Sequence, residues 1–180
     1  GRSVSRYVIK LLIVDDSALM RRLLSGIFAA EGDFLVEIAR DGAEALDKLM
    51  SFSPDGCTLD SHMPGLDGLA CLDRIMVEKP CPVVMVSSLT TEGANETLEA
   101  ISLGAIDFVE KPTGAVSLEI GRIAPSLVEK VRAASRARLS RTHRLSERLR
   151  RRNDRSRDTA YPVAAPRVRH KMTGPVQDGV

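Results

Sequence analysis

Five short apolar segments alternate with amphipathic segments along the first 131 residues, and this alternation restricts the fold more than any other feature. The apolar segments, which we predict to be strands, are residues 8–14, 34–38, 55–60, 82–86 and 106–109. Between the first two, Leu19, Leu23 and Ile27 recur every fourth residue, which predicts an amphipathic helix. Strands that alternate with helices favour a parallel sheet with helices on both faces. We therefore predict an α/β fold with a five-stranded, parallel, doubly wound sheet.

The last two predicted helices carry weaker patterns. After the fourth apolar segment, Leu98 and Ile101 are the side chains expected to face the sheet. Pro125 suits the first turn of the final helix, because a first-turn residue leaves its backbone N–H unpaired and proline has none. We expect this helix to continue into an Arg-rich segment and to end before Tyr161.

The net charge of +2 conceals two segments of opposite sign. Residues 1–131 carry 12 Lys or Arg against 20 Asp or Glu, whereas residues 132–180 carry 14 against 4. We therefore predict a domain over residues 8–131 and a basic helical or disordered tail over residues 132–180. Such a tail suits a flexible linker, or it binds nucleic acid or another acidic surface without specificity. The sequence shows no helix-turn-helix, zinc-finger or aromatic-interleaved pattern, so we expect no specific nucleic-acid binding.

The composition also limits the compartment. The three cysteines, Cys57, Cys71 and Cys81, lack the spacing of a zinc site and are expected to be small buried side chains. The sequence contains no run approaching the roughly 20 apolar residues of a membrane span. We therefore expect a cytoplasmic protein without a membrane span.

Polar side chains gather where the predicted strands end. Asp15 and Asp16 follow the first strand and Asp60 ends the third, while Ser87 and Lys111 follow the fourth and fifth. Because the carboxyl ends of parallel strands lie at one edge of a sheet, we expect these side chains to converge. Adjacent carboxylates repel each other unless a cation lies between them, and Mg²⁺ prefers such oxygen ligands. The sequence therefore predicts a magnesium site.

Carboxylates, an ammonium group and a hydroxyl around one cation suit phosphoryl chemistry. A carboxylate such as Asp60 can attack phosphorus and form an acyl phosphate. The new dianion needs the metal and a positive side chain such as Lys111. Ser87 can hydrogen-bond a phosphate oxygen only when that oxygen is present, so it is a candidate switch contact.

Each of these residues also has an ordinary structural interpretation. Asp15 or Asp16 can cap the following helix, and Asp60 can be a loop acid. Lys111 can be a solvated surface lysine. His62 can be an exposed loop side chain that modulates water access.

Four blocks of sequence resemble the receiver domain of two-component response regulators. The blocks are Leu12–Ser17, Thr58–Gly68, Val84–Ser88 and Lys111–Pro112. Longer matches at residues 15–21, 82–90 and 103–112 are similar to the receiver of the chemotaxis protein-glutamate methylesterase, the CheB family. The resemblance implies a flavodoxin-like receiver fold in which a βα unit is repeated five times.

The resemblance also assigns roles to the residues at the strand ends. Asp60 would be the phosphoacceptor and would take a phosphoryl group from the phosphohistidine of a chemotaxis histidine kinase. Asp16, Asp60 and the backbone carbonyl of His62 would ligate Mg²⁺, and Asp15 would act through a bound water. Lys111 would pair with the phosphoryl group.

Two further features belong to the same family pattern. Ser87 and Phe108 would form a hydroxyl and aromatic switch pair, although Phe108 is equally suited to core packing. The Lys111–Pro112 bond would be cis and would hold the lysine in place.

The sequence departs from the family pattern next to the phosphoacceptor. Gly56 takes the place of a branched apolar residue in a central strand, and Ser61 replaces another apolar residue. Glycine in a strand interior costs up to about 1 kcal/mol of stability. On sequence alone we expect Gly56→Val to raise the melting temperature.

The catalytic domain of the methylesterase family has no counterpart in residues 132–180, which contain no Gly-x-Ser-x-Gly turn and are too few for a hydrolase sheet. We expect no esterase activity from this chain alone, and action on chemoreceptors only through a domain that it lacks. The predicted function is regulation of such a methylesterase by phosphorylation. Two alternatives stay open. One is a stand-alone receiver that serves as a phosphate sink or docking adaptor. The other is a phosphatase with an aspartyl nucleophile, for which His62 stands where an acid is needed.

Overall fold

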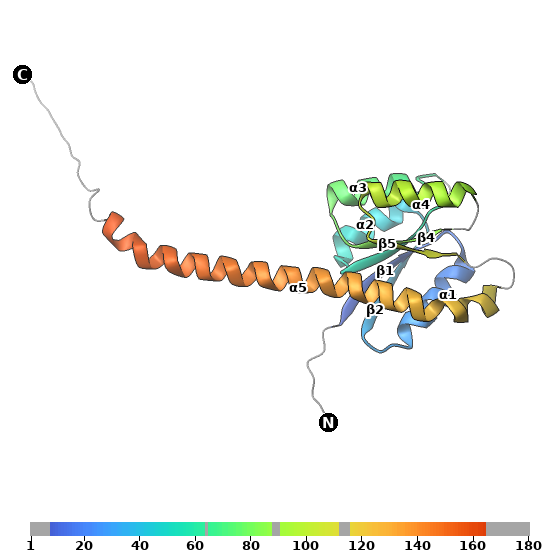
Figure 1. The fold of residues 1–180 in the computed structure, drawn as a ribbon, viewed down its shortest axis with the longest axis horizontal. Helices are drawn as coiled ribbons and strands as arrows, with labels where there is room; N and C mark the ends of the chain where they lie inside the picture. The colour runs from blue at the N-terminus through green and yellow to red at the C-terminus, as the bar shows by residue number, and fades with distance from the viewer. Residues whose placement is uncertain (1–7, 64, 88–90, 112–115, 165–180) are drawn as a thin grey trace, which may run out of the picture. The chain divides into compact units, whose positions relative to one another are not determined.

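The protein forms a parallel sheet within the first of two compact units. The structure is a computed structural model that describes residues 8–63, 65–87, 91–111 and 116–164. The two units are residues 1–139 and residues 140–180. The strands are β1 (Ile9–Val14), β2 (Phe34–Ala39), β3 (Gly56–Asp60), β4 (Val83–Ser87) and β5 (Asp107–Glu110). They pair in parallel in the order β2-β1-β3-β4-β5 (Figure 1). The predicted α/β fold is confirmed, and every predicted strand boundary lies within one residue of the observed one.

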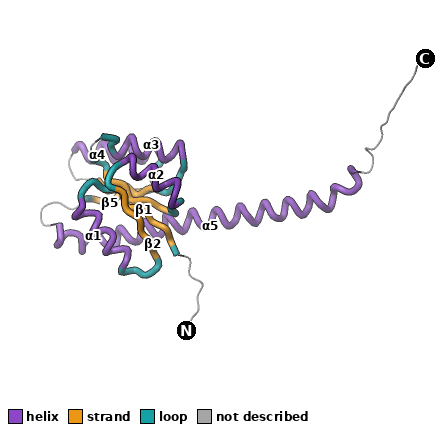
Figure 2. Tube along the Cα trace, turned by 180° about the vertical axis from the view of Figure 1, so that it is seen from behind, coloured by secondary structure: helices purple, strands orange, loops and turns teal. Residues whose placement is uncertain are grey.

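Helices cover both faces of this sheet, as Figure 2 shows from behind. They are α1 (Ala18–Ala29), α2 (Gly42–Phe52), α3 (Gly68–Glu78), α4 (Thr91–Leu103) and α5 (Val116–Ala164). On one face, Phe28 of α1 and Val131 of α5 pack in a buried cluster with residues of β1 and β4. On the other face, Leu49 of α2, Ile75 of α3 and Ala100 of α4 belong to a second cluster. The sheet therefore lies between two layers of helices.

The central strands are buried on both sides. In β1, Leu11 and Ile13 belong to one cluster, whereas Leu12 and Val14 belong to the other. Every residue of β3 and β4 is buried. Double burial explains why these segments are continuous apolar runs rather than alternating ones. It also places their polar terminal residues at the edge of a rigid core.

The predicted inner face of α4 is wrong. Leu98 and Ile101 are 72% and 43% exposed, whereas Thr97 and Ala100 are buried. The side of this helix that packs against the sheet therefore carries small side chains. A hydrophobic pattern cannot identify such a face, because its strongest apolar residues lie on the other side.

The predicted ends of α5 are also wrong. The helix begins at Val116, nine residues before Pro125, and continues beyond Tyr161 to Ala164. Both predictions gave proline too much weight. The φ angle of proline, about −65°, fits a helix, and the main cost of proline there is the hydrogen bond that its nitrogen cannot donate. Packing on the sheet continues past residue 131, since Ala134 and Ser135 are buried.

The second unit contains the C-terminal part of α5. Among its described side chains, Arg144, Arg148 and the three arginines at 150–152 are exposed. The described parts of the chain contain no helix that combines the length and apolar character needed to span a bilayer. The linker role of residues 132–180 stays a prediction.

The three cysteines are free and buried, as predicted. Burial is the largest cause that raises the pKa of Cys71 to about 11 and that of Cys81 to about 12. Burial likewise raises the pKa of Cys57, which lies in β3. All three thiols therefore stay protonated and behave as small apolar side chains.

Gly56 is not a defect in β3 but the contact point for α5. A Cβ built at Gly56 would overlap the Oγ of Ser135, a residue with no exposed surface. The other neighbours of that Cβ, Ser135 Cβ at 3.7 Å and the carbonyl oxygen of Pro82 at 3.9 Å, are at ordinary contact distances. The hydroxyl of Ser135 therefore sets the limit on side-chain size at position 56.

We therefore expect Gly56→Val to lower the free energy of unfolding by about 1–3 kcal/mol, as overpacking of a core does. This reverses the expectation from sequence alone. Gly56→Ala should also destabilise the protein, but in a Ser135→Ala background the same change should be neutral or stabilising. Urea denaturation of the four proteins in this cycle measures the coupling. If Gly56→Ala had the same effect in both backgrounds, Ser135 would not be the cause.

Candidate functional site

The carboxyl end of β1 supplies two acids in different environments. Asp15 is 1% exposed, whereas Asp16 is exposed. The backbone N–H of Ser17 donates to Asp15 Oδ1 at 2.9 Å. Ser17 itself is the N-cap of α1, because its hydroxyl accepts a hydrogen bond from the Met20 N–H at 3.2 Å. The alternative in which Asp15 or Asp16 caps this helix is wrong.

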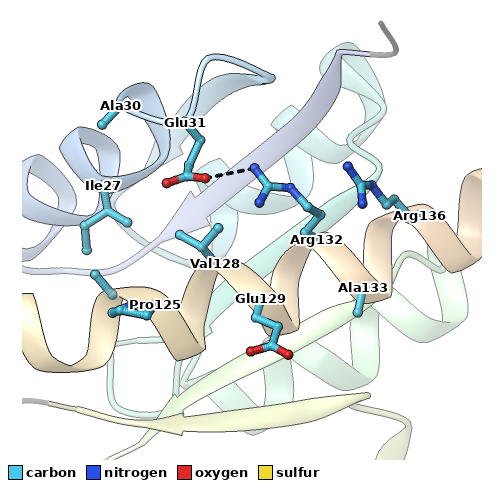
Figure 3. A pocket seen from close by; sticks show the side chains of 10 residues that line it. Ile27, Ala30, Glu31, Pro125, Val128, Glu129, Arg132, Ala133 and Arg136 are labelled. Carbon is cyan, nitrogen blue, oxygen red and sulfur yellow. Dashed lines mark hydrogen bonds and ion pairs between the residues drawn. The ribbon is translucent and has the colours of Figure 1, made fainter.

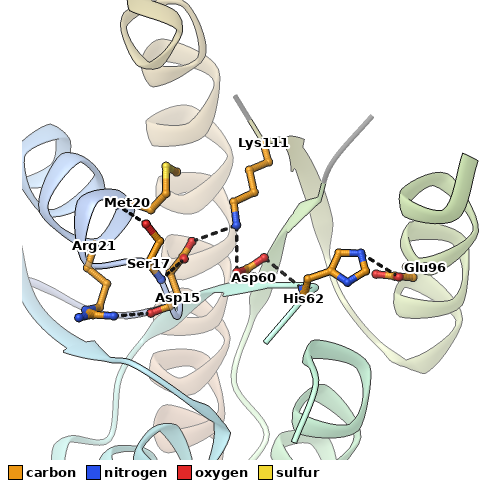
Figure 4. Close-up of polar contacts among 8 residues, drawn as sticks. All are labelled: Asp15, Ser17, Met20, Arg21, Asp60, His62, Glu96 and Lys111. Atoms are coloured by element: carbon orange, nitrogen blue, oxygen red, sulfur yellow. Dashed lines mark hydrogen bonds and ion pairs between the residues drawn. The ribbon is translucent and has the colours of Figure 1, made fainter. Parts of the chain in front are cut away.

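Asp60 and Lys111 meet at the ends of β3 and β5. Lys111 Nζ donates to Asp60 Oδ2 at 3.0 Å, and the backbone N–H of His62 donates to Asp60 Oδ1 at 3.1 Å. Lys111 Nζ also lies 3.8 Å from Asp15 Oδ2. Figure 4 shows the ammonium group between the two carboxylates. Asp60 is therefore neither a loop acid nor exposed, and Lys111 is not a solvated surface lysine.

The three acids form one cluster. Carboxylate oxygens of Asp15, Asp16 and Asp60 lie within 4.8 Å of one another. Burial, together with the charge of Asp60, raises the pKa of Asp15 to about 6. Burial also raises the pKa of Asp60, although the His62 N–H and Lys111 oppose this effect.

Lys111 offsets only part of this negative charge. Its burial disfavours the ammonium form, but Asp15 and Asp60 outweigh that effect and raise the pKa of Lys111. One ammonium therefore faces three carboxyl groups at neutral pH. Asp15 Oδ2 is buried and has no hydrogen-bond partner among the described residues. A crowded set of hard oxygen ligands with excess negative charge fits a divalent cation such as Mg²⁺.

Ser87 ends β4 beside this cluster. Its side chain is buried, and its Oγ has no hydrogen-bond partner in the part of the chain that the structure describes. Its carbonyl oxygen accepts a hydrogen bond from the Lys111 N–H at 2.6 Å, which fixes β4 and β5 together at the site. A buried hydroxyl without a partner costs stability. A ligand oxygen placed here would relieve that cost.

Phe108 is not a core residue. It is 44% exposed, and Lys130 Nζ of α5 lies 5.2 Å from the centre of its ring. The core-packing interpretation is therefore wrong, and the pairing of Phe108 with Ser87 stays a prediction. Pro112 lies outside the described residues, and so does the predicted cis bond before it.

His62 makes a contact that the sequence did not reveal. Its Nε2 lies 3.1 Å from Glu96 Oε1 of α4, while the second carboxylate oxygen of Glu96 is buried without a described partner. His62 is therefore held by two contacts, through its backbone N–H to Asp60 and through its side chain to Glu96 of α4 (Figure 4). The pairing joins segments 34 residues apart in sequence, so no local pattern indicates it.

Gly68 holds α3 against the backbone that carries Asp60. A Cβ at this position would lie 2.5 Å from Ser61 Cα and 2.8 Å from the Ser61 carbonyl oxygen. The Gly68 N–H donates to that same oxygen at 3.3 Å. Backbone atoms cannot rotate away as a side chain can, so only glycine permits this approach.

Gly68→Ala should therefore lower the free energy of unfolding by about 2 kcal/mol or more, because backbone must move to accommodate the methyl group. Gly26→Ala is the matched control. Gly26 lies inside α1 with open space around its would-be Cβ, so alanine there should stabilise the protein by up to about 1 kcal/mol. Thermal and urea unfolding of both variants test the contrast. Equal stability of the two variants would contradict the close approach of α3.

Comparisons with known proteins agree with this geometry. Residues 11–120 match the family described as "Response regulator receiver domain". A protein-glutamate methylesterase/protein-glutamine glutaminase from Rhodopseudomonas palustris (strain BisB18) is 54% identical over 143 residues, which are 79% of this chain and 39% of the relative. One from Rhodospirillum rubrum is 53% identical over 167 residues, 93% of this chain and 43% of the relative. The chain thus spans about two fifths of the length of these curated relatives.

A solved structure is similar as well. The crystal structure of the response regulator domain of Thermotoga maritima CheB is 47% identical, with a TM-score of 0.66. The match covers 72% of this chain and 97% of that one. The family match, the parallel sheet and the acids and lysine gathered at its carboxyl edge agree. The chain belongs to the response regulator receiver domain family, and its receiver is of the CheB-like chemotaxis type.

Proposed function

We propose that this receiver accepts a phosphoryl group on Asp60 from the phosphohistidine of a chemotaxis histidine kinase, with Mg²⁺ bound at the acidic cluster. One observation carries the proposal. Asp60 is buried at the end of β3, with one carboxylate oxygen 3.0 Å from Lys111 Nζ and with oxygens of Asp15 and Asp16 within 4.8 Å of its own.

Asp60 supplies the nucleophile. A carboxylate oxygen attacks phosphorus, the new O–P bond forms, and the P–N bond to the donor imidazole breaks, so the product is an acyl phosphate. The donor imidazole takes up a proton as it leaves. The His62 N–H, which donates to Asp60 Oδ1 at 3.1 Å, fixes the rotation of the carboxylate.

The remaining residues at the site hold charge. Asp16, Asp60 and the backbone carbonyl of His62 would ligate Mg²⁺, and Asp15 would act through a bound water. When bound, this ion neutralises negative charge on the transferring phosphoryl oxygens. Lys111 pairs with the product phosphoryl group, since it is protonated and already donates to Asp60.

Ser87 would respond to phosphorylation of Asp60. Its buried Oγ lacks a described partner, so a phosphoryl oxygen beside Asp60 would give it one. The Ser87 carbonyl is bonded to the Lys111 N–H, so movement of the hydroxyl toward the phosphoryl group is coupled to the ends of β4 and β5. Such a small shift at the ends of β4 and β5 would transmit the phosphorylation state of Asp60 to the surface of the domain.

The output that we propose is control of a protein-glutamate methylesterase that acts on chemoreceptors. The support is similarity: the relatives from Rhodopseudomonas palustris and Rhodospirillum rubrum bear that enzyme's name, and this chain matches 39% and 43% of their lengths. The residues of the acidic cluster would regulate that activity rather than perform it.

The test uses acetyl phosphate as a small phosphodonor. With Mg²⁺, the intact mass of the chain should rise by one phosphoryl group, and peptide mapping should place that group on Asp60. With EDTA in place of Mg²⁺, labelling should fall to background. Labelling that persists without a divalent ion, or that maps to another residue, would refute the assignment.

A further inference from the structure

The side chain of His62 is directed away from the acidic cluster, although its backbone lies beside it. The His62 N–H donates to Asp60 Oδ1 at 3.1 Å, so the residue begins within hydrogen-bond distance of the proposed phosphoacceptor. Its imidazole ring nevertheless points toward α4, as Figure 4 shows. There its Nε2 lies 3.1 Å from Glu96 Oε1, and the side chain is 51% exposed. The ring is therefore held on the side away from Asp60.

Glu96 is poorly satisfied compared with other paired carboxylates of the same unit. Arg132 of α5 donates to Glu31, as Figure 3 shows, and also to both carboxylate oxygens of Asp33. Glu96 is 17% exposed, and only its Oε1 has a partner among the described residues, namely the ring of His62. A buried oxygen without a partner costs stability. The position of Glu96 is therefore poorly explained by stability alone, which favours a role through His62.

The acidic cluster is a site to which a free imidazole would be attracted. Carboxylate oxygens of its three acids lie within 4.8 Å of one another, and Lys111 supplies one ammonium group among them. An imidazole ring carries at least one N–H donor in either protonation state. Residue 62 is only two positions after Asp60, so the torsions of the His62 side chain decide whether the ring faces α4 or the acids.

We propose that Glu96 is a positioning residue for the site at Asp60, because it holds the His62 ring away from the acidic cluster. Without this acceptor, the ring N–H would donate to a carboxylate of the cluster. The ring would then occupy the space in which Mg²⁺ and the phosphoryl group are held. Glu96 touches neither of them and acts only through His62. The inference rests on the proposed phosphoryl transfer and adds a residue of α4 to it.

A simple tether between α4 and the residue after Ser61 is the competing explanation. If the contact only fixed the His62 backbone, removal of either side chain would loosen that backbone, and removal of both would be no better than removal of one. If Glu96 restrains the ring, removal of the ring should cancel the effect of losing Glu96. The two explanations therefore predict opposite results for the double variant.

Two measurements on the 180-residue chain test the proposal: the rate of labelling by acetyl phosphate with Mg²⁺, and the rise in melting temperature that Mg²⁺ causes. In Glu96→Met, which keeps a long side chain but only a weak acceptor, we expect labelling to slow by about fivefold or more, because hydrogen bonds to carboxylates are strong. The Mg²⁺-induced rise should also be smaller. Both quantities should recover in Glu96→Met/His62→Ala. Glu96→Gln should stay close to the wild type, because its amide oxygen accepts the same N–H.

Glu99→Met is the matched control, since Glu99 is an exposed acid of the same helix, and both quantities should stay unchanged in it. Circular dichroism establishes that each variant is folded, and Glu96→Ala replaces Glu96→Met if the latter does not fold. The proposal is overturned if Glu96→Met behaves like the wild type, or if the double variant is as impaired as Glu96→Met. The response to Mg²⁺ requires no phosphoryl transfer. Failure of Asp60 as the phosphoacceptor is therefore distinguishable from failure of Glu96 as a positioning residue.

Discussion

Asp60→Asn is expected to abolish labelling of the chain by acetyl phosphate. The amide nitrogen and oxygen of asparagine fit the same space, but the side chain has no anionic oxygen to attack phosphorus. The wild-type chain should gain one phosphoryl group in the presence of Mg²⁺, and the variant should gain none. Intact mass spectrometry measures both, and circular dichroism establishes that the variant is folded.

Asp73→Asn is the matched control for this experiment. Asp73 is an exposed acid of α3, outside the acidic cluster, so its replacement should leave labelling unchanged. A phosphoryl group that still appeared on Asp60→Asn would move the phosphoacceptor to another residue. Loss of labelling in both variants would point to a general effect of charge rather than to the nucleophile.

Asp15→Asn should stabilise the protein when no divalent ion is present. Burial raises the pKa of Asp15 from 3.8 to about 6, so at pH 7.5 the folded state carries a carboxylate that it disfavours. A pKa difference of about two units corresponds to about 3 kcal/mol. Asparagine removes this cost, which is a net value that already includes the attraction to Lys111. We therefore expect the free energy of unfolding to rise by up to about 3 kcal/mol in urea denaturation with EDTA.

The pH dependence of stability is a second test of the raised pKa of Asp15. Because the folded pKa of Asp15 is the higher one, the folded state binds more protons than the unfolded state between about pH 4 and pH 6. The contribution of Asp15 to stability is therefore most favourable below this window and is lost as the pH rises through it. In Asp15→Asn that part of the decline should disappear. Asp73→Asn should keep it.

Added Mg²⁺ should reverse the order of stability. A ligand that binds only the folded state stabilises it by an amount that grows with the logarithm of the ligand concentration divided by Kd, and Asp15 belongs to the cluster that fits the ion. The melting temperature of the wild type should therefore rise with Mg²⁺ more than that of Asp15→Asn. An equal rise in both proteins would remove Asp15 from the ion site, whatever its effect on stability.

The positions of the clustered side chains could be predicted because the ends of buried strands can be recognised in the sequence. Asp15, Asp60, Ser87 and Lys111 follow apolar runs, and in a parallel sheet such residues must meet at one edge. The observed distances between Lys111 and the two acids follow from that topology. The same runs gave the strand boundaries, since a doubly buried strand is apolar throughout.

The failures share a different cause. The inner face of α4 carries Ala100 and Thr97, so size and not hydrophobicity determined which side packs inward. The fit of Gly56 against Ser135 and the pairing of His62 with Glu96 join residues far apart in the chain. Such contacts depend on where two elements approach each other in space. Propensity and periodicity describe one element at a time and cannot reveal them.

The three buried thiols can report transient opening of the domain. The chain has no tryptophan, so intrinsic indole fluorescence cannot follow its unfolding. Cys57 lies in β3, Cys71 in α3 and Cys81 just before β4, and all are shielded from solvent. A thiol-reactive dye can reach them only when the strand that presents Asp60, or the layer covering it, separates from the core. The rate of dye incorporation, with and without Mg²⁺, therefore measures how often the core around the acidic cluster opens transiently.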